Sequence, residues 1–263
     1  MNDEVALALE DQSHYLAKMA INLTRGEAEG TIIGDAPVRP ELFTPGTQWA
    51  RGGVLTTMVD LVAGHVPDGP HGPTVDMRLR IVAPPPTTGR IRLEARPLRI
   101  GRRLIVSETA LSAGPGTTPF GWATATFINT VVADFMDDHR PVAPPMDEAS
   151  FDEFLGATVR DDATLEVAPS PRIDNGIQLT VQGGAQALLA ELAAAHLLGA
   201  GEPLVATDLD IRFLDRLYVG PLAARAVEVA SHDGVPRAHV TLFDAGKDDR
   251  VVSVVTVSMT RSA

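Results

Sequence analysis

The chain has 263 residues, 44% hydrophobic and 21% charged, which is enough for one large domain or two smaller ones with a real core. Its net charge of −12 and pI of about 4.9 argue against nucleic acid as a partner, because phosphate backbones attract basic proteins. The absence of cysteine excludes disulfides, thiolate metal sites and cysteine nucleophiles. The N-terminus lacks the positive charge of a secretory signal and no apolar run could span a bilayer, so we expect a cytoplasmic protein without a membrane partner.

The first distinctive element is the segment RGGVLTTMVDLVAG at residues 51–64. Its glycine pair predicts a tight turn, and the residues after it predict a helix that is apolar on every side except at Asp60. A buried carboxylate without a partner costs several kcal/mol or takes up a proton. Asp60 therefore has either a functional role or a structural partner, such as an arginine or a neighbouring element that it caps.

The segments that follow are rich in Val, Ile, Leu and Thr with partial alternation, which is typical of strands. Turn signals such as IGRR and SAGPG separate them, so we expect an antiparallel meander. The predicted strands of this half are 74–81, 91–98, 104–113 and 123–127. An acidic, proline-rich segment comes next, and we expect 133–158 to link an N-terminal unit at 1–132 to a C-terminal unit at 159–263.

The second unit repeats the central helix of the first. Residues 182–200 again hold a glycine pair, at 183–184 in place of 52–53, followed by an apolar helix. The one acidic residue of that helix, Glu191, stands seven residues after the second glycine, as Asp60 does in the first copy. Because two such helices must each be enclosed on most sides, we expect one curved antiparallel sheet around both.

The strand motifs repeat with a constant offset. TVDMRLRI at 74–81 matches ATDLDIRF at 206–213, and ATATF at 123–127 matches VTVSM at 255–259, each 132 residues later. The segment AHVTLFDA at 238–245 supplies a further strand of the second meander. Neither metal-ligand spacing nor a nucleotide-binding glycine motif occurs, so we expect no cofactor and no metal.

The motif GGVLTTMVD followed by TVDMRLRIVAP resembles the hotdog-fold thioesterases of the PaaI type, and its tandem copy resembles a double-hotdog protein. The resemblance covers roughly residues 28–132 and 160–263. It implies an α+β fold, a tandem (double) hotdog in which antiparallel sheets each wrap a central helix. It also implies an acyl-CoA thioesterase that forms a homo-oligomer, a dimer or trimer of double hotdogs.

In that family a carboxylate about two turns into the central helix acts as general base or nucleophile on the thioester. The amide of the first glycine of the pair comes from the opposite subunit and holds the thioester oxygen, while a Ser or Thr at the TVDM position helps to place the attacking water. One candidate site therefore combines Asp60 and Thr74 with Gln182, Gly183 and Asn175 of the second unit. We expect this site to be the working one, because every expected kind of group is present.

The other candidate site combines the carboxylate of Glu191 with Arg51, Gly52 and Gly53 of the first unit. The hydroxyl position is Ala206 here, so this site lacks at least one expected group. The alternative is that Glu191 is a packing partner left in a vestigial site. In both sites the residue before the glycines departs from the histidine that is commoner in the family.

Three further residues are expected to contact the substrate. Gly184 follows Gly183 in the first site, and Arg102 and Arg103 lie in the basic segment RIGRRL, where they either bind the phosphates of CoA or face solvent. A hotdog enoyl-CoA hydratase is disfavoured, because no segment like GDxNPxH occurs. A non-catalytic acyl-CoA sensor is the remaining alternative, and Asp60 argues against it.

Overall fold

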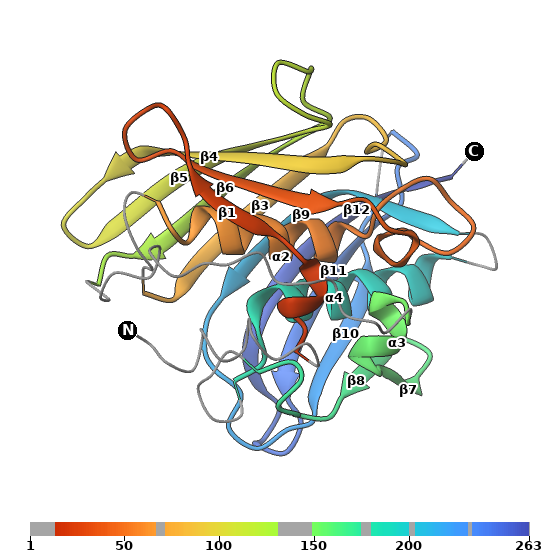
Figure 1. The fold of residues 1–263 in the computed structure, drawn as a ribbon. Coiled ribbons are helices and arrows are strands. Elements are labelled where there is room, and N and C mark those ends of the chain that lie inside the picture. Colours follow the sequence, from red (N-terminus) through yellow and green to blue (C-terminus); the bar gives the residue numbers. More distant parts are fainter. Residues whose placement is uncertain are drawn as a thin grey trace.

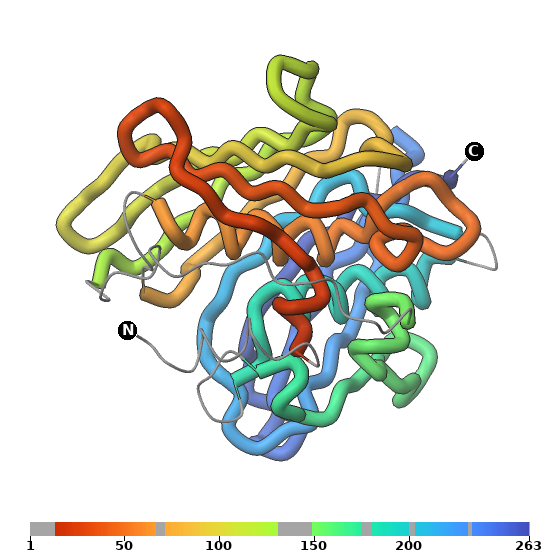
Figure 2. Tube along the Cα trace, viewed as in Figure 1, coloured from red at the N-terminus to blue at the C-terminus, as the bar shows by residue number. Residues whose placement is uncertain are grey.

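The structure, a computed structural model, describes residues 14–66, 72–130, 149–174, 180–199, 203–230 and 233–262. Twelve strands form one antiparallel sheet that curves around two long helices, one from each half of the chain (Figure 1). The trace in Figure 2 shows the two halves side by side, each with its own helix against its own part of the sheet. The predicted α+β architecture of one continuous sheet around two central helices is confirmed.

The first half folds in the predicted order of lead-in, helix and meander. Its elements are η1 (Ala17–Met19), β1 (Asn22–Arg25), β2 (Ile32–Pro37), η2 (Pro40–Leu42), α2 (Gly52–Ala63), β3 (Thr74–Ile81), β4 (Arg90–Ile100), β5 (Leu104–Ser112) and β6 (Gly121–Ile128). Buried and exposed residues alternate along β4, β5 and β6, as expected for strands that cover a core on one face.

The second half repeats this order. Its elements are α3 (Phe151–Leu155), β7 (Thr158–Asp161), β8 (Thr164–Val167), α4 (Gly183–Leu198), β9 (Leu204–Phe213), β10 (Leu222–Glu228), β11 (Arg237–Asp244) and β12 (Arg250–Arg261). None of the helices in the described ranges combines the length and the apolarity needed to cross a membrane.

The two halves meet at the centre of the sheet. The strand order is β1-β2-β4-β5-β6-β3-β9-β12-β11-β10-β8-β7, so the second half continues the first in reverse. Across the seam between β3 and β9, Arg80 is opposite Asp208, and Asp76 is opposite Arg212. The two arginines are equivalent positions of the repeats, and so are the two aspartates, which means that the seam has local two-fold symmetry.

Helices α2 and α4 cross closely at their N-terminal turns. A β-carbon on Gly53 would lie 2.3 Å from the Cα of Leu188, and one on Gly184 would lie 1.8 Å from Oγ1 of Thr57. No side chain fits at these distances, so the second glycine of each pair is required by helix packing.

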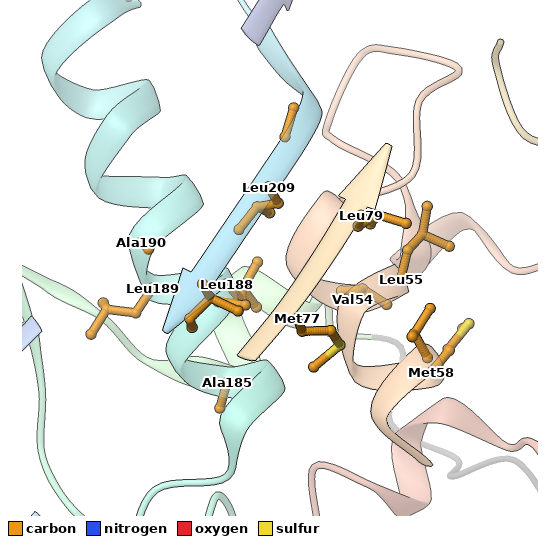
Figure 3. Packing of buried hydrophobic residues seen from close by; sticks show 14 of the residues in the cluster. Val54, Leu55, Met58, Met77, Leu79, Ala185, Leu188, Leu189, Ala190 and Leu209 are labelled. Atoms are coloured by element: carbon orange, nitrogen blue, oxygen red, sulfur yellow. The ribbon is translucent and has the colours of Figure 1, made fainter. Parts of the chain in front are cut away.

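Figure 3 shows the core where the helices meet the central strands. Val54 of α2 and Leu188 of α4 are fully buried, and Met77 of β3 and Leu209 of β9 are at most 2% exposed. Full burial of such a side chain contributes roughly 1.5–3 kcal/mol, so this shared core holds the two halves together as one unit.

The start of the described chain crosses to the second half. The amide of Tyr15 donates to the carbonyl of Arg172, and the Tyr15 ring packs against Phe151 and Phe154 of α3. Helix α3 falls inside the segment 133–158 that the sequence predicts as a linker. The last part of that segment is therefore a packed helix.

Candidate active site

Asp60 lies near the C-terminal end of α2, with hydrogen-bond donors from both halves of the protein. The hydroxyl of Thr74, at the start of β3, donates to Oδ1 of Asp60 at 2.7 Å. The side-chain amide of Gln182 donates to Oδ2 at 3.3 Å. Asp60 is partly exposed as a residue, and the two donors hold both oxygens of its carboxylate in place.

The N-terminal turn of α4 faces this carboxylate across the seam. A β-carbon on Gly183 would lie 3.6 Å from Oδ2 of Asp60. Gln182 caps the helix, because its Oε1 accepts from the amide of Ala185 at 3.0 Å, and this contact directs its Nε2 toward Asp60. Within the described chain no group accepts a hydrogen bond from the amide of Gly184.

A β-bulge orients Thr74. In the pairing of β3 with β6, Thr74 is opposite Phe127 and Asp76 is opposite Thr126, so Val75 is an extra residue. Such a bulge shifts the alternation of side chains by one. The Asp76 carboxylate accepts instead from the Thr126 hydroxyl at 3.0 Å, while the Thr74 hydroxyl is turned toward Asp60.

The surroundings of Asp60 favour a carboxyl group that titrates near neutrality. Burial raises the pKa of Asp60 from 3.8 to about 6, and the hydrogen bond from Thr74 opposes this rise. No arginine or lysine forms an ion pair with Asp60 among the described residues. A group with such a pKa can accept a proton near neutral pH, which is the requirement for a general base.

Glu191 occupies the symmetry-related position in α4, and its environment differs. It is 0% exposed, and its Oε2 accepts from the amide of Gly53 at 2.8 Å. Its Oε1 lies 3.8 Å from a guanidinium nitrogen of Arg51. Burial raises the pKa of Glu191, while Arg51 and the amides of the glycine turn oppose that rise. The Glu191 side chain is one methylene longer than that of Asp60, and its carboxylate occupies the amide of the Gly52–Gly53 turn to which a substrate oxygen would bind.

Side chains from other elements close this second site. Arg51 forms an ion pair with Asp152 of α3, and the hydroxyl of Thr57 donates to that of Tyr15 at 3.3 Å. Burial raises the pKa of Tyr15, and the nearby Glu191 and Asp152 act in the same direction. The groups around Glu191 therefore form a closed polar cluster beneath α3 and the start of the described chain.

In the second site the residue that corresponds to Thr74 is Ala206, which has no hydroxyl group. Ala206 is fully buried and a β-carbon on Gly52 would lie 3.0 Å from its Cβ. Thr207 is the bulged residue of β9, and its hydroxyl donates to the carbonyl of Ser258 at 3.3 Å. It does not replace the contact that Thr74 makes with Asp60.

The remaining predicted contact residues are Arg102, Arg103 and Asn175. Arg102 and Arg103 are exposed in the turn between β4 and β5, and β5 is two strands from the β3 strand that carries Thr74, which is roughly 10 Å across the sheet. Asn175 lies outside the described residues. No group of three or more His, Cys, Asp or Glu that could hold a metal occurs in the part of the chain that the structure describes.

Comparison with known proteins gives the fold. No protein-family model matches the chain, and no curated sequence matches it significantly. An acyl-CoA thioesterase II of Mycobacterium marinum matches in structure with a TM-score of 0.62 at 13% identity, over 94% of this chain and 97% of that one. A protein of unknown function with a hot dog fold from Alicyclobacillus acidocaldarius gives 0.62 at 15% identity, over 95% and 98%.

A third structure, a tesB protein of Mycobacterium avium subsp. paratuberculosis, gives a TM-score of 0.61 at 14% identity, over 94% of this chain and 98% of that one. The chain has the double-hotdog fold. The match extends over both halves, so the tandem arrangement inferred from the repeat is confirmed. At these identities the likeness shows that the chain has the same fold and does not show its chemistry.

Sequence reasoning missed two residues that shape the double-hotdog sites. Asp152 lies in the segment expected to be a linker and forms an ion pair with Arg51. The sequence signal for an ordered helix there is the capping pattern SFDE. Phe213 lies beside Gly183, and its ring carbon Cζ would be 3.0 Å from a β-carbon there. The sequence predicted its place at the end of a strand, but it did not predict the contact of this side chain with the Gly183 turn of α4.

Proposed function

We propose that this double-hotdog protein hydrolyses acyl-CoA thioesters at the site around Asp60. The observation that carries the proposal is the placement of the Asp60 carboxylate, held by Thr74 and Gln182 beside the Gly183 turn of the other half. A solved structure with the same fold is named an acyl-CoA thioesterase II, which supports the class of substrate.

The glycine turn at the start of α4 would bind the oxyanion that forms during thioester cleavage. Amides in the first turn of a helix have no partner within the helix and lie at its positive end. The other candidate site supports this role, because there the amide of Gly53, the equivalent of Gly184, binds a carboxylate oxygen of Glu191. One such donor to a developing oxyanion contributes roughly 3–4 kcal/mol, so the Gly183 and Gly184 amides would supply a large part of the rate.

Two balanced routes use these groups. In the first, Asp60 takes a proton from a water molecule, the resulting hydroxide adds to the carbonyl carbon, and collapse of the oxyanion expels the CoA thiolate, which takes that proton from Asp60. In the second, Asp60 itself attacks, expels the thiolate and forms a mixed anhydride, which water then hydrolyses. Both routes need ionised Asp60, and Thr74 and Gln182 hold its two oxygens in either case.

The test measures thiol release from acyl-CoAs of graded chain length, with wild-type protein and with Asp60→Asn. We expect turnover of at least one substrate, a rate that rises with pH through about 6 as Asp60 ionises, and a loss of about 10³-fold in the variant. Activity that survives in Asp60→Asn would remove the site assignment. Tight acyl-CoA binding without turnover of any thioester would favour the sensor.

A further inference from the structure

We propose that Phe213 is a specificity-determining residue that limits the width of the acyl group next to the reacting carbonyl. The inference rests on the proposed function and goes beyond it by naming the wall of the acyl site. Phe213 is the last residue of β9, and its side chain shares the inner face of the sheet with the buried Ile211.

The ring and the carboxylate flank one position. A β-carbon on Gly183 would lie 3.0 and 3.2 Å from Cζ and Cε1 of Phe213, and 3.6 Å from Oδ2 of Asp60. The edge of the Phe213 ring and the carboxylate oxygen are therefore both neighbours of Gly183 in the glycine turn. A thioester carbonyl attacked near Asp60 and bound by this turn has to lie within van der Waals reach of the ring.

Hydrogen bonds connect the strand that carries the ring to the glycine turn. Phe213 is opposite Ser253 in the pairing of β9 with β12, and the Ser253 hydroxyl donates to Oε1 of Gln186 at 2.9 Å. Gln186 lies one turn after Gln182 on α4, and its Nε2 donates to the carbonyl of Val181 at 2.9 Å. These contacts connect the strand that carries the ring to the first turn of α4, so they fix the backbone of Phe213 relative to the glycine turn.

The Phe213 ring is better suited to contact the apolar acyl group of the substrate than the polar pantetheine arm. Phe213 is partly buried and packs against the hydrophobic core, and it has no polar atom to serve the amides of the pantetheine arm. The equivalent residue of the other half is Ile81, and a β-carbon on Gly52 would meet Ala206, Leu209 and Glu191 instead of it. The aromatic wall is thus a feature of the Asp60 site.

The experiment compares kcat/KM for butyryl-CoA, its branched isomer isobutyryl-CoA and the wide benzoyl-CoA in wild type and Phe213→Ala. Because a pocket that gains room for one or two methyl groups changes discrimination by about tenfold or more, we expect the ratios of isobutyryl-CoA and benzoyl-CoA to butyryl-CoA to rise by about that factor. Leu214→Ala is the matched control, since the neighbouring Leu214 side chain is 60% exposed, and it should leave the ratios unchanged.

A rise of about fivefold or more in either ratio supports the assignment, and a smaller rise in both overturns it. An equal change for all three substrates also overturns it, because it would place the ring against the common pantetheine arm. If Phe213→Ala does not fold, Phe213→Leu is judged by the same rule, since leucine lacks the Cε1 and Cζ atoms that face Gly183. Failure of wild type to cleave any thioester would instead defeat the proposed function.

Discussion

The two halves of the protein carry a carboxylate at the same place in their central helix, and the carboxylates have opposite surroundings. Asp60 is partly exposed, accepts hydrogen bonds from a hydroxyl and an amide, and faces a glycine turn whose Gly184 amide is not taken by any described residue. Glu191 is fully buried, faces an arginine, and binds the amide of Gly53 itself. The repeat duplicates the fold, but the two candidate sites differ in chemistry.

The difference follows from a few substitutions between the halves. One additional methylene lets Glu191 reach the glycine amide, Ala206 removes the hydroxyl that Thr74 supplies, and Arg51 replaces the neutral amide of Gln182 with a charge. Each change favours a stable ion-pair cluster over an accessible base. A buried carboxylate that is paired is a structural group, whereas one that is kept without a cation indicates a function.

The largest effect on stability is expected from Glu191→Ala. This change leaves the Gly53 amide without its acceptor and Arg51 without one of its two carboxylates, and it opens a cavity beside α2. We expect a loss of about 2–4 kcal/mol in the free energy of unfolding, measured by urea denaturation.

Glu191→Gln is the matched control, because it keeps the shape and an acceptor oxygen, and we expect a loss of at most about 1 kcal/mol. If Glu191→Ala were as stable as wild type, Glu191 would not have the structural role assigned to it here, and the contrast between the two carboxylates would be weakened.

A smaller effect of opposite sign is expected from Asp60→Asn. Because burial raises the pKa of Asp60 to about 6 from 3.8, the folded state holds the proton more tightly than the unfolded state between these values. Stability due to this group is therefore present at low pH and falls as the pH rises through about 6. Replacing the carboxylate with an amide removes that penalty, so the variant should be more stable by about 1–3 kcal/mol at neutral pH.

The check is urea denaturation of wild type and Asp60→Asn at neutral pH and again near pH 4, where the gain should disappear. A functional carboxylate held at a cost to stability gives this pattern. A structural ion-pair carboxylate gives the reverse, so a less stable Asp60→Asn at neutral pH would show that Asp60 has a structural partner.

Much of the fold was predictable because each half is strongly patterned. The strand predicted at 74–81 coincides with β3, the helix expected from the turn at 52–53 coincides with α2, and the shared offset of 132 residues required two similar units. Local periodicity determines such elements. The four-residue β1, β7 and β8 are too short for their alternation to be recognised, and β7 begins inside the segment expected as linker.

The first candidate site was predictable in part for a different reason. The pairing of Asp60 with Thr74 and Gln182 came from the family resemblance, and the geometry brings these residues together. The sequence could not predict the distances between residues that belong to different helices and strands. The reach of Glu191 to the Gly53 amide and the position of Phe213 depend on the crossing of α2 with α4 and on the seam of the sheet, and no local pattern encodes either.

The functional contrast between Asp60 and Glu191 can be measured directly as thiol release from the best acyl-CoA substrate by wild type, Asp60→Asn and Glu191→Gln. Both variants exchange one carboxylate oxygen for an amide nitrogen at equivalent positions of the two halves. We expect a loss of about 10³-fold for Asp60→Asn and of less than about threefold for Glu191→Gln. Equal losses in the two variants, or a greater loss in Glu191→Gln, would contradict this expectation.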